Sequence, residues 1–148
     1  MTQALATPAP LAALAEHAWG YPALEVVHIV GIALLLGNLV LVELRVWGLG
    51  SGIALPALAR LALAVALAGF GLASGSGLLM FATQPVELLA NRAFVLKMAL
   101  LAVAGTNAAV FHARGGLARL NRFARAQTVL SLGLWLGVII CGRGIAYQ

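Results

Sequence analysis

The sequence predicts an all-α integral membrane protein, a bundle of four transmembrane helices with a short N-terminal interfacial helix. Two observations on composition favour this class: hydrophobic residues make up 63% of the 148-residue chain against 9% charged residues, and the mean hydropathy is +1.04. A soluble domain of this length could not bury so much apolar surface, whereas a bilayer acts as its solvent. A third observation is that the apolar residues gather in long stretches, each approaching the about 20 residues that cross about 30 Å of hydrocarbon.

We expect a single transmembrane domain over residues 1–148, with spans at about 24–46, 61–83, 94–113 and 126–146. A lipid-exposed segment must satisfy its own backbone hydrogen bonds, so each span is expected to be a helix. The alternating pattern of a transmembrane β-barrel does not occur in the sequence.

The segment before the first span, Leu11 to Trp19, is typical of a short amphipathic helix at the interface. Trp19 and Tyr21 are expected to anchor it there, and Pro22 separates it from the first span. The N-terminus lacks the basic start and long apolar core of a cleaved signal peptide, so the first span is expected to act as its own insertion signal.

Glycine and proline mark the breaks between the later spans. The Gly-rich segment 48–52 with Pro56 follows the first span, Thr83-Gln-Pro85 ends the second, and Gly115-Gly116 ends the third. Within the spans, Gly71 and Gly75, and likewise Gly133 and Gly137, are spaced four apart, which favours close helix packing.

Charge placement predicts the orientation. The formal net charge is +5, and the basic residues lie at the ends of the apolar runs. The loops after the first and third spans hold Arg45, Arg60, Arg114, Arg119, Arg122 and Arg125, whereas the opposite side holds Arg92, Lys97 and Arg143, offset by Glu16, Glu25 and Glu87. The positive-inside rule then places the basic loops in the cytoplasm and both termini outside a bacterial plasma membrane. No base-reading motif accompanies these charges, so nucleic acid is excluded as a partner.

Ionisable residues at membrane depth indicate function by default. The expected outer layer contains Glu25, His28, Met80, Lys97, Met98, Cys141 and Arg143. Glu25 and His28 are three apart, so they share a helix face on which the carboxylate can orient the ring. Lys97 lies near enough to the surface to snorkel or to pair with Glu25.

Two interpretations of this layer stay open. In one it is a salt-bridge network that holds the helix ends. In the other His28 is an axial ligand of heme b or a copper ligand, and Met80, Met98 or Cys141 supplies a soft second donor. Lys97 and Arg143 would then pair with the heme propionates or with another anion.

The expected inner layer contains Asn38, Glu43, Arg45, Asn107 and His112. Glu43 and Arg45 point to different helix faces, so Arg45 is expected to pair with another carboxylate or with lipid phosphate. We expect Glu25, Glu43, Arg45 and Asn107 to form structural polar networks. His112 is a further candidate ligand, with a solvated interfacial histidine as the alternative.

The chain has only 3 histidines and 1 cysteine. His28 and His112 lie near opposite faces of the membrane, on the order of 20 Å apart, so they cannot bracket one heme within a protomer. A second histidine ligand requires His17 to fold over the bundle or a second copy of the chain.

The order of motifs resembles a family of small four-helix bacterial membrane proteins classed as a domain of unknown function. The resemblance rests on the early His28, on Glu43-Leu-Arg-Val-Trp-Gly48, on Phe94-Val-Leu-Lys97 and on Asn107-Ala-Ala-Val-Phe-His112. It implies a four-helix fold and draws attention to His28, Glu43, Arg45, Lys97, Asn107 and His112, but supplies no reaction. A weaker likeness to the copper-resistance membrane domain rests on a histidine followed by glycine.

The leading hypothesis is a redox or electron-transfer membrane protein that binds heme b through His28 and is not an enzyme by itself. The alternatives are a protein that handles copper or another small solute, and a non-catalytic membrane subunit. The expected partners are the lipid bilayer and a second copy or a larger membrane complex.

Overall fold

The computed structural model describes residues 17–147 and contains four long helices with short connections. These helices are α2 (Gly20–Val46), α3 (Leu55–Thr83), α5 (Arg92–Ala113) and α6 (Arg122–Gly144). A short helix, α4 (Pro85–Ala90), joins α3 to α5, and one 3-10 turn, η2 (Ile145–Tyr147), follows α6. All four long helices are long and apolar enough to cross a membrane. The prediction of an all-α, multi-pass membrane bundle is therefore confirmed, while the interfacial helix predicted over 11–19 begins outside the described residues.

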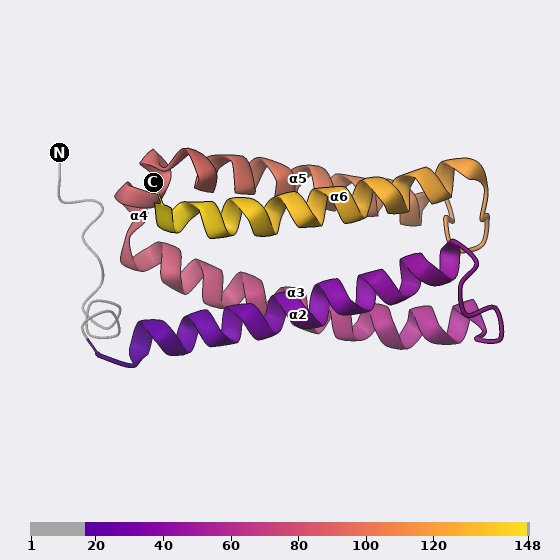
Figure 1. Cartoon of the computed structure of the whole chain (residues 1–148), viewed down its shortest axis with the longest axis horizontal. Helices are drawn as coiled ribbons and strands as arrows, with labels where there is room; N and C mark the ends of the chain where they lie inside the picture. Colours follow the sequence, from indigo (N-terminus) through magenta and orange to yellow (C-terminus); the bar gives the residue numbers. More distant parts are fainter. Residues whose placement is uncertain (1–16, 148) are drawn as a thin grey trace.

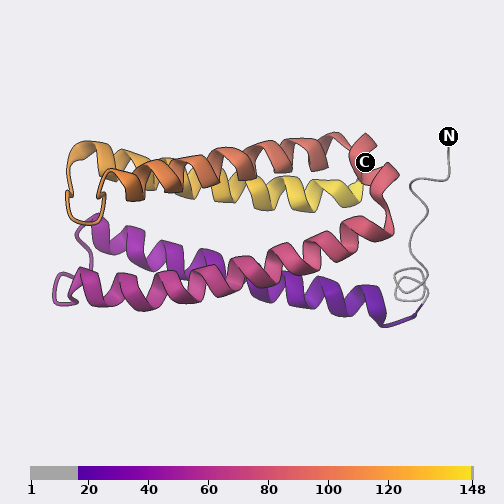
Figure 2. The same ribbon diagram turned by 180° about the vertical axis from the view of Figure 1, so that it is seen from behind.

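The four long helices form two hairpins, α2–α3 and α5–α6, that lie side by side along the long axis (Figures 1 and 2). The connections 47–54 and 114–121 lie together at one end, which we call the loop end. The start of α2, helix α4 and the C-terminal end of α6 lie at the other, which we call the terminal end. This arrangement brings residues distant in sequence to the same depth.

The first hairpin is held by a backbone-to-backbone contact where α2 crosses α3. A Cβ atom built on Gly31 would lie 2.6 Å from the Ala73 nitrogen, and one on Gly69 would lie 2.6 Å from the Leu35 nitrogen. Small residues let helices approach this closely, and without a hydrophobic driving force such contacts stabilise helix pairs in membranes. The face of α3 that meets α2 carries Ala59, Ala62, Ala66, Gly69, Ala73 and Ser76.

The prediction that Gly71 and Gly75 pack against another helix is wrong within the protomer, because a Cβ atom at either would meet nothing within 4 Å. Gly133 likewise faces open space. Gly137 does face a neighbour, the Leu100 side chain, whose Cδ1 would lie 3.2 Å from an added Cβ. Spacing alone did not reveal the packing face, because Ala-rich helices carry small residues on every face.

The second hairpin begins each of its helices with an asparagine cap. The Asn91 side chain accepts a hydrogen bond from the Phe94 nitrogen at 3.1 Å, and Asn121 accepts one from the Ala124 nitrogen at 2.8 Å. These caps satisfy backbone donors that a helix start leaves open. They explain why both helices begin a few residues before their predicted spans.

A polar contact joins the two hairpins near the loop end. The Trp47 indole Nε1 donates to the Thr128 hydroxyl at 2.8 Å, and that hydroxyl donates in turn to the Arg125 carbonyl at 2.7 Å. Beside it, Val42 and Val46 pack with Leu55 and Ala62 as a small apolar core. The loop end is thus closed by tertiary contacts.

Candidate functional site

His28 lies on the face of α2 that points into the protein, one turn from the close contact at Gly31. The buried residues of α2 include Gly31, Leu35 and Val42, which follow a helical spacing that His28 extends toward the terminal end. The imidazole is partly buried and reaches across to α3.

Two groups on α3 fix the orientation of the His28 ring. Its Nδ1 atom lies 2.8 Å from the Ala73 carbonyl oxygen and 3.1 Å from the Ser76 hydroxyl. A carbonyl only accepts hydrogen bonds, so Nδ1 carries the proton and donates it to Ala73. The neutral ring then presents its lone pair at Nε2. Ser76 uses its own proton to donate to the Leu72 carbonyl at 2.6 Å.

Gly77 makes room for this ring. A Cβ atom there would lie 3.2 Å from His28 Cε1, tighter than ordinary van der Waals contact, and 3.5 Å from Nδ1. The sequence Ala73 to Gly77 therefore supplies an acceptor, a hydroxyl and a gap for one histidine.

Lys97 enters the same layer from the second hairpin. It lies on the inward stripe of α5, between the buried residues Ala93 and Ala104, and its Nζ atom would lie 3.6 Å from a Cβ added at Gly142 of α6. Its charge interacts with both the His28 ring and the Cys141 thiol. All four long helices thus contribute to one polar layer near the terminal end.

The free ends of His28 and Lys97 stay open to a ligand. Within residues 17–147, neither His28 Nε2 nor Lys97 Nζ forms a hydrogen bond. Glu43 Oε2 is the one side-chain N or O atom there that is both fully buried and without a partner, so neither of these two nitrogens is fully buried. A water-sized molecule therefore reaches both atoms. The layer presents the imidazole lone pair of His28 and, from the second hairpin, the unpaired ammonium group of Lys97.

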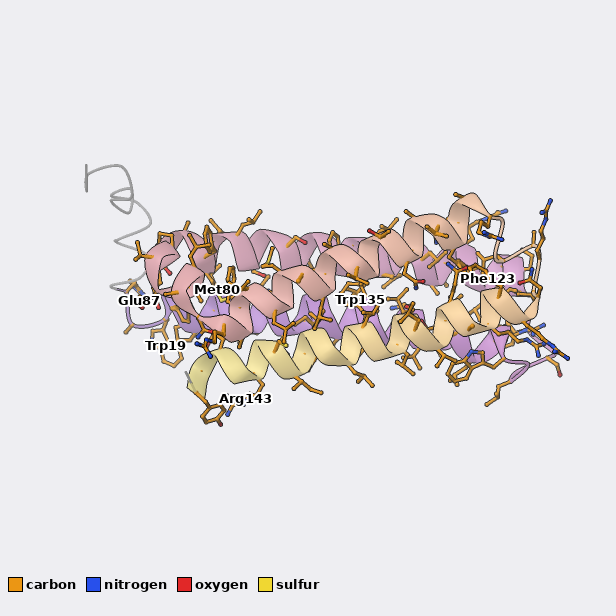
Figure 3. All side chains as sticks on the ribbon, turned by 90° about the horizontal axis from the view of Figure 1, so that it is seen from above. Trp19, Met80, Glu87, Phe123, Trp135 and Arg143 are labelled. Atoms are coloured by element: carbon orange, nitrogen blue, oxygen red, sulfur yellow. The ribbon has the colours of Figure 1, made fainter. Side chains whose placement is uncertain are left out.

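Several residues expected in this layer point elsewhere. Met98 is 49% exposed on the outer surface of α5, and the exposed Arg143 donates to the Tyr147 hydroxyl at 2.6 Å and stacks on its ring. Glu25 is exposed and forms neither the expected hydrogen bond to His28 nor an ion pair with Lys97 within the described chain. Met98, Arg143 and Glu25 are therefore not brought to the His28 ring. Figure 3 shows Met80 at the same end of the bundle as Arg143 and Glu87, and the Met80 side chain is half-buried.

The salt-bridge interpretation of this layer fails for the described residues, because His28 is oriented by α3 and Lys97 has no carboxylate partner there. The donor set is also sparse. Residues 17–147 contain no group of three or more His, Cys, Asp or Glu side chains that could hold a metal ion.

The second polar layer lies toward the loop end. Asn107 Nδ2 donates to the Gln127 carbonyl at 3.0 Å and so joins α5 to α6, whereas Asn38 donates within α2 to Leu34. Arg45 does not pair with a carboxylate, because its Nε donates to the Ile53 carbonyl at 2.7 Å and thereby holds the turn after α2.

His112 and His17 both lie away from the bundle interior. His112 is exposed and packs edge-on against Phe111, with ring centroids 5.5 Å apart. The exposed His17 accepts a hydrogen bond from the Trp19 nitrogen at 3.3 Å. Neither ring is brought to His28 within the protomer.

Glu43 is the residue whose setting the sequence did not reveal. It is 5% exposed, and its Oε2 atom has no hydrogen-bond partner. Its side chain faces the seam between the two hairpins, where α2 meets α6. The Ser131 hydroxyl of α6 lies beside it there, and this neighbour was not predicted either. A carboxylate two residues before an arginine and close to a loop is typical of the membrane–water interface, so the sequence did not indicate that Glu43 is buried.

No family model, curated protein or solved structure matches this chain.

Proposed function

We propose that this protein is a membrane-embedded redox protein that binds heme b through His28 Nε2. One observation carries the proposal: the Nδ1 proton is committed to the Ala73 carbonyl, so the lone pair at Nε2 has no hydrogen-bond partner among residues 17–147 and is not fully buried. Histidines that ligate metals usually donate their other ring nitrogen to a carbonyl or carboxylate, which fixes the tautomer and ring orientation. Heme bound there supplies a one-electron redox couple.

Lys97 favours an anionic cofactor. Its ammonium has no carboxylate partner among residues 17–147, and an anionic group would stabilise this half-buried charge. Heme propionates meet this need. A bare copper ion fits less well, because Lys97 repels a second cation near His28 and Cys141.

The protomer offers one histidine at this depth. We therefore propose that any second ligand of the cofactor would come from an exogenous molecule or from a second copy of the chain. His28 and Lys97 hold the cofactor from opposite hairpins, and Ser76 maintains the histidine orientation through its contact with Nδ1.

We further propose that the loop end faces the cytoplasm of a bacterial cell and the His28 layer lies toward the outside. Support comes from the basic residues of the loop end, which are mostly exposed, and from the preference of cytoplasmic loops for Arg and Lys. A cofactor in this layer is then placed to exchange electrons at the outer surface.

The test is an absorption spectrum of detergent-purified protein made with ample heme supply. We expect a Soret band that His28→Ala abolishes. Added imidazole should restore the band, because it replaces the missing ligand but not the covalent link of the side chain to α2. His112→Ala is the matched control and should keep the full band. Colourless wild-type protein, or equal loss of colour in both variants, would overturn the proposal.

A further inference from the structure

A second site lies at the other end of the bundle, around the carboxyl group of Glu43. The residue belongs to the last turn of α2, and only 5% of its surface is exposed. It sits where α2 passes α6, next to the Trp47–Thr128 hydrogen bond that joins the hairpins. Among residues 17–147, its Oε2 is the buried side-chain oxygen that no donor satisfies.

No cation compensates this carboxyl group. Arg45 is two residues away but donates to the carbonyls of the following turn, at Ile53 and Ser51. The remaining loop-end arginines of the described chain, Arg60, Arg114, Arg119, Arg122 and Arg125, are exposed. No charged group acts on Glu43, whose setting is defined by burial and by the Ser131 hydroxyl.

The elements packed around Glu43 offer neutral groups only. The facing part of α3 carries buried alanines such as Ala59 and Ala62. On α6, the Ser131 hydroxyl lies beside the carboxyl group, and the Thr128 hydroxyl is already engaged as an acceptor from Trp47 and a donor to Arg125. On α5, the polar side chains toward the loop end are neutral and already bonded, Asn107 to the Gln127 carbonyl of α6 and Thr106 to the Ala102 carbonyl of its own helix.

An ionised carboxylate in such a setting is strongly disfavoured, because burial removes its hydration and, among the described residues, one neutral hydroxyl, that of Ser131, is all that replaces it. A carboxylic acid is neutral, and its hydroxyl hydrogen can be donated to the Ser131 oxygen. We propose that Glu43 is a proton-binding site, held as the neutral acid in the seam between the two hairpins. Release of this proton places a charge in the seam and requires water to enter it.

A metal cation is a poorer occupant. Hard cations such as Ca²⁺ take about 6–8 oxygen ligands. The Glu43 carboxyl, Ser131 and the one remaining lone pair of the Thr128 hydroxyl supply too few. A proton needs one oxygen and one acceptor, which this seam provides.

The experiment is infrared difference spectroscopy of the full-length protein in lipid at neutral pH. Wild type should show a carboxylic-acid C=O band that shifts in D₂O and disappears in Glu43→Gln. Ser131→Ala should shift the band, because it removes the acceptor. Glu87→Gln, which changes an exposed carboxyl at the terminal end, is the matched control and should leave the band unchanged.

The stability of Glu43→Gln provides a second measurement. A glutamine resembles the neutral acid, so this variant should unfold at the same or a higher temperature than wild type. Absence of the acid band in wild type, or a clear loss of stability in Glu43→Gln, would overturn the proposal. A band that vanishes on addition of sodium ions would instead assign the site to a cation and would also overturn it.

Discussion

The two hairpins of this bundle are built by different means. In α2–α3, glycines at the crossing bring backbone against backbone, and no flexible side chain lies between them. In α5–α6, contact runs through side chains such as Leu100 and through the Asn107–Gln127 hydrogen bond. Backbone atoms in contact leave the first hairpin less room to adjust than the second, and the hydrogen bonds of His28 Nδ1 lie within it. Lys97 comes from the half that can adjust.

The largest effect on stability is expected for Gly69→Ala, at the helix crossing of the first hairpin. Its new Cβ would lie 2.6 Å from the Leu35 nitrogen and 2.7 Å from the Gly31 oxygen, which are backbone atoms and cannot rotate away. Overpacking typically costs about 1–3 kcal/mol, and we expect a loss of unfolding free energy at or above the top of this range. Denaturant titration in detergent micelles measures it.

Gly71→Ala is the matched control, because it lies on the same helix and faces open space. It should change the unfolding free energy by less than about 0.5 kcal/mol. Equal losses in the two variants would show that the crossing contact is not what holds the first hairpin.

A smaller effect is expected for Asn107→Ala in the second hairpin. It removes the hydrogen bond to the Gln127 carbonyl at 3.0 Å. Interhelical hydrogen bonds in membranes contribute about 0.6 kcal/mol on average and up to about 1.7 kcal/mol, so the loss should fall within these values. Thr106→Ala, which affects a bond within α5 only, is the control for the same titration, and a loss as large as that of Asn107→Ala would contradict the assignment.

The smallest effect is expected for Gly137→Ala. Its Cβ would lie 3.2 Å from Leu100 Cδ1, the far end of a side chain that can change rotamer. The loss should stay below about 1 kcal/mol. Combining it with Leu100→Ala should remove the cost of the added methyl group. A loss matching that of Gly69→Ala would show that both hairpins are equally rigid.

The helices were predictable because uninterrupted apolar runs leave few alternatives in a bilayer. Their ends were less so. Helix α3 begins at Leu55, about one and a half turns before the predicted start, since an exposed Arg60 is compatible with a helix that continues into the interface. The short helix α4 was not predicted, although Pro85 at its first position is a common start signal.

The sequence predicted the depth of the site residues in the membrane, but not the direction in which each side chain points from its helix. His28 and Lys97 were expected in one layer, and the structure places them near enough for the Lys97 charge to act on the His28 ring, without a hydrogen bond between them. Met98 follows Lys97 directly and faces outward, because one residue turns a helix by about 100°. The rotation of each helix about its own axis depends on the helices that pack against it. The sequence alone therefore did not identify Ser76, Gly77 and Ser131 as neighbours of the two sites.

The unequal lengths of the helices carry a consequence for how the protein sits in lipid. Helices α2 and α3 have 27 and 29 residues, and α5 and α6 have 22 and 23. At ~1.5 Å per residue the first pair is roughly 5–10 Å longer than the second. A bilayer has one local thickness, and a longer helix can match it by tilting, which the crossing of α2 over α3 allows (Figures 1 and 2). Hydrophobic mismatch therefore acts first on the α2–α3 crossing, one helical turn from His28.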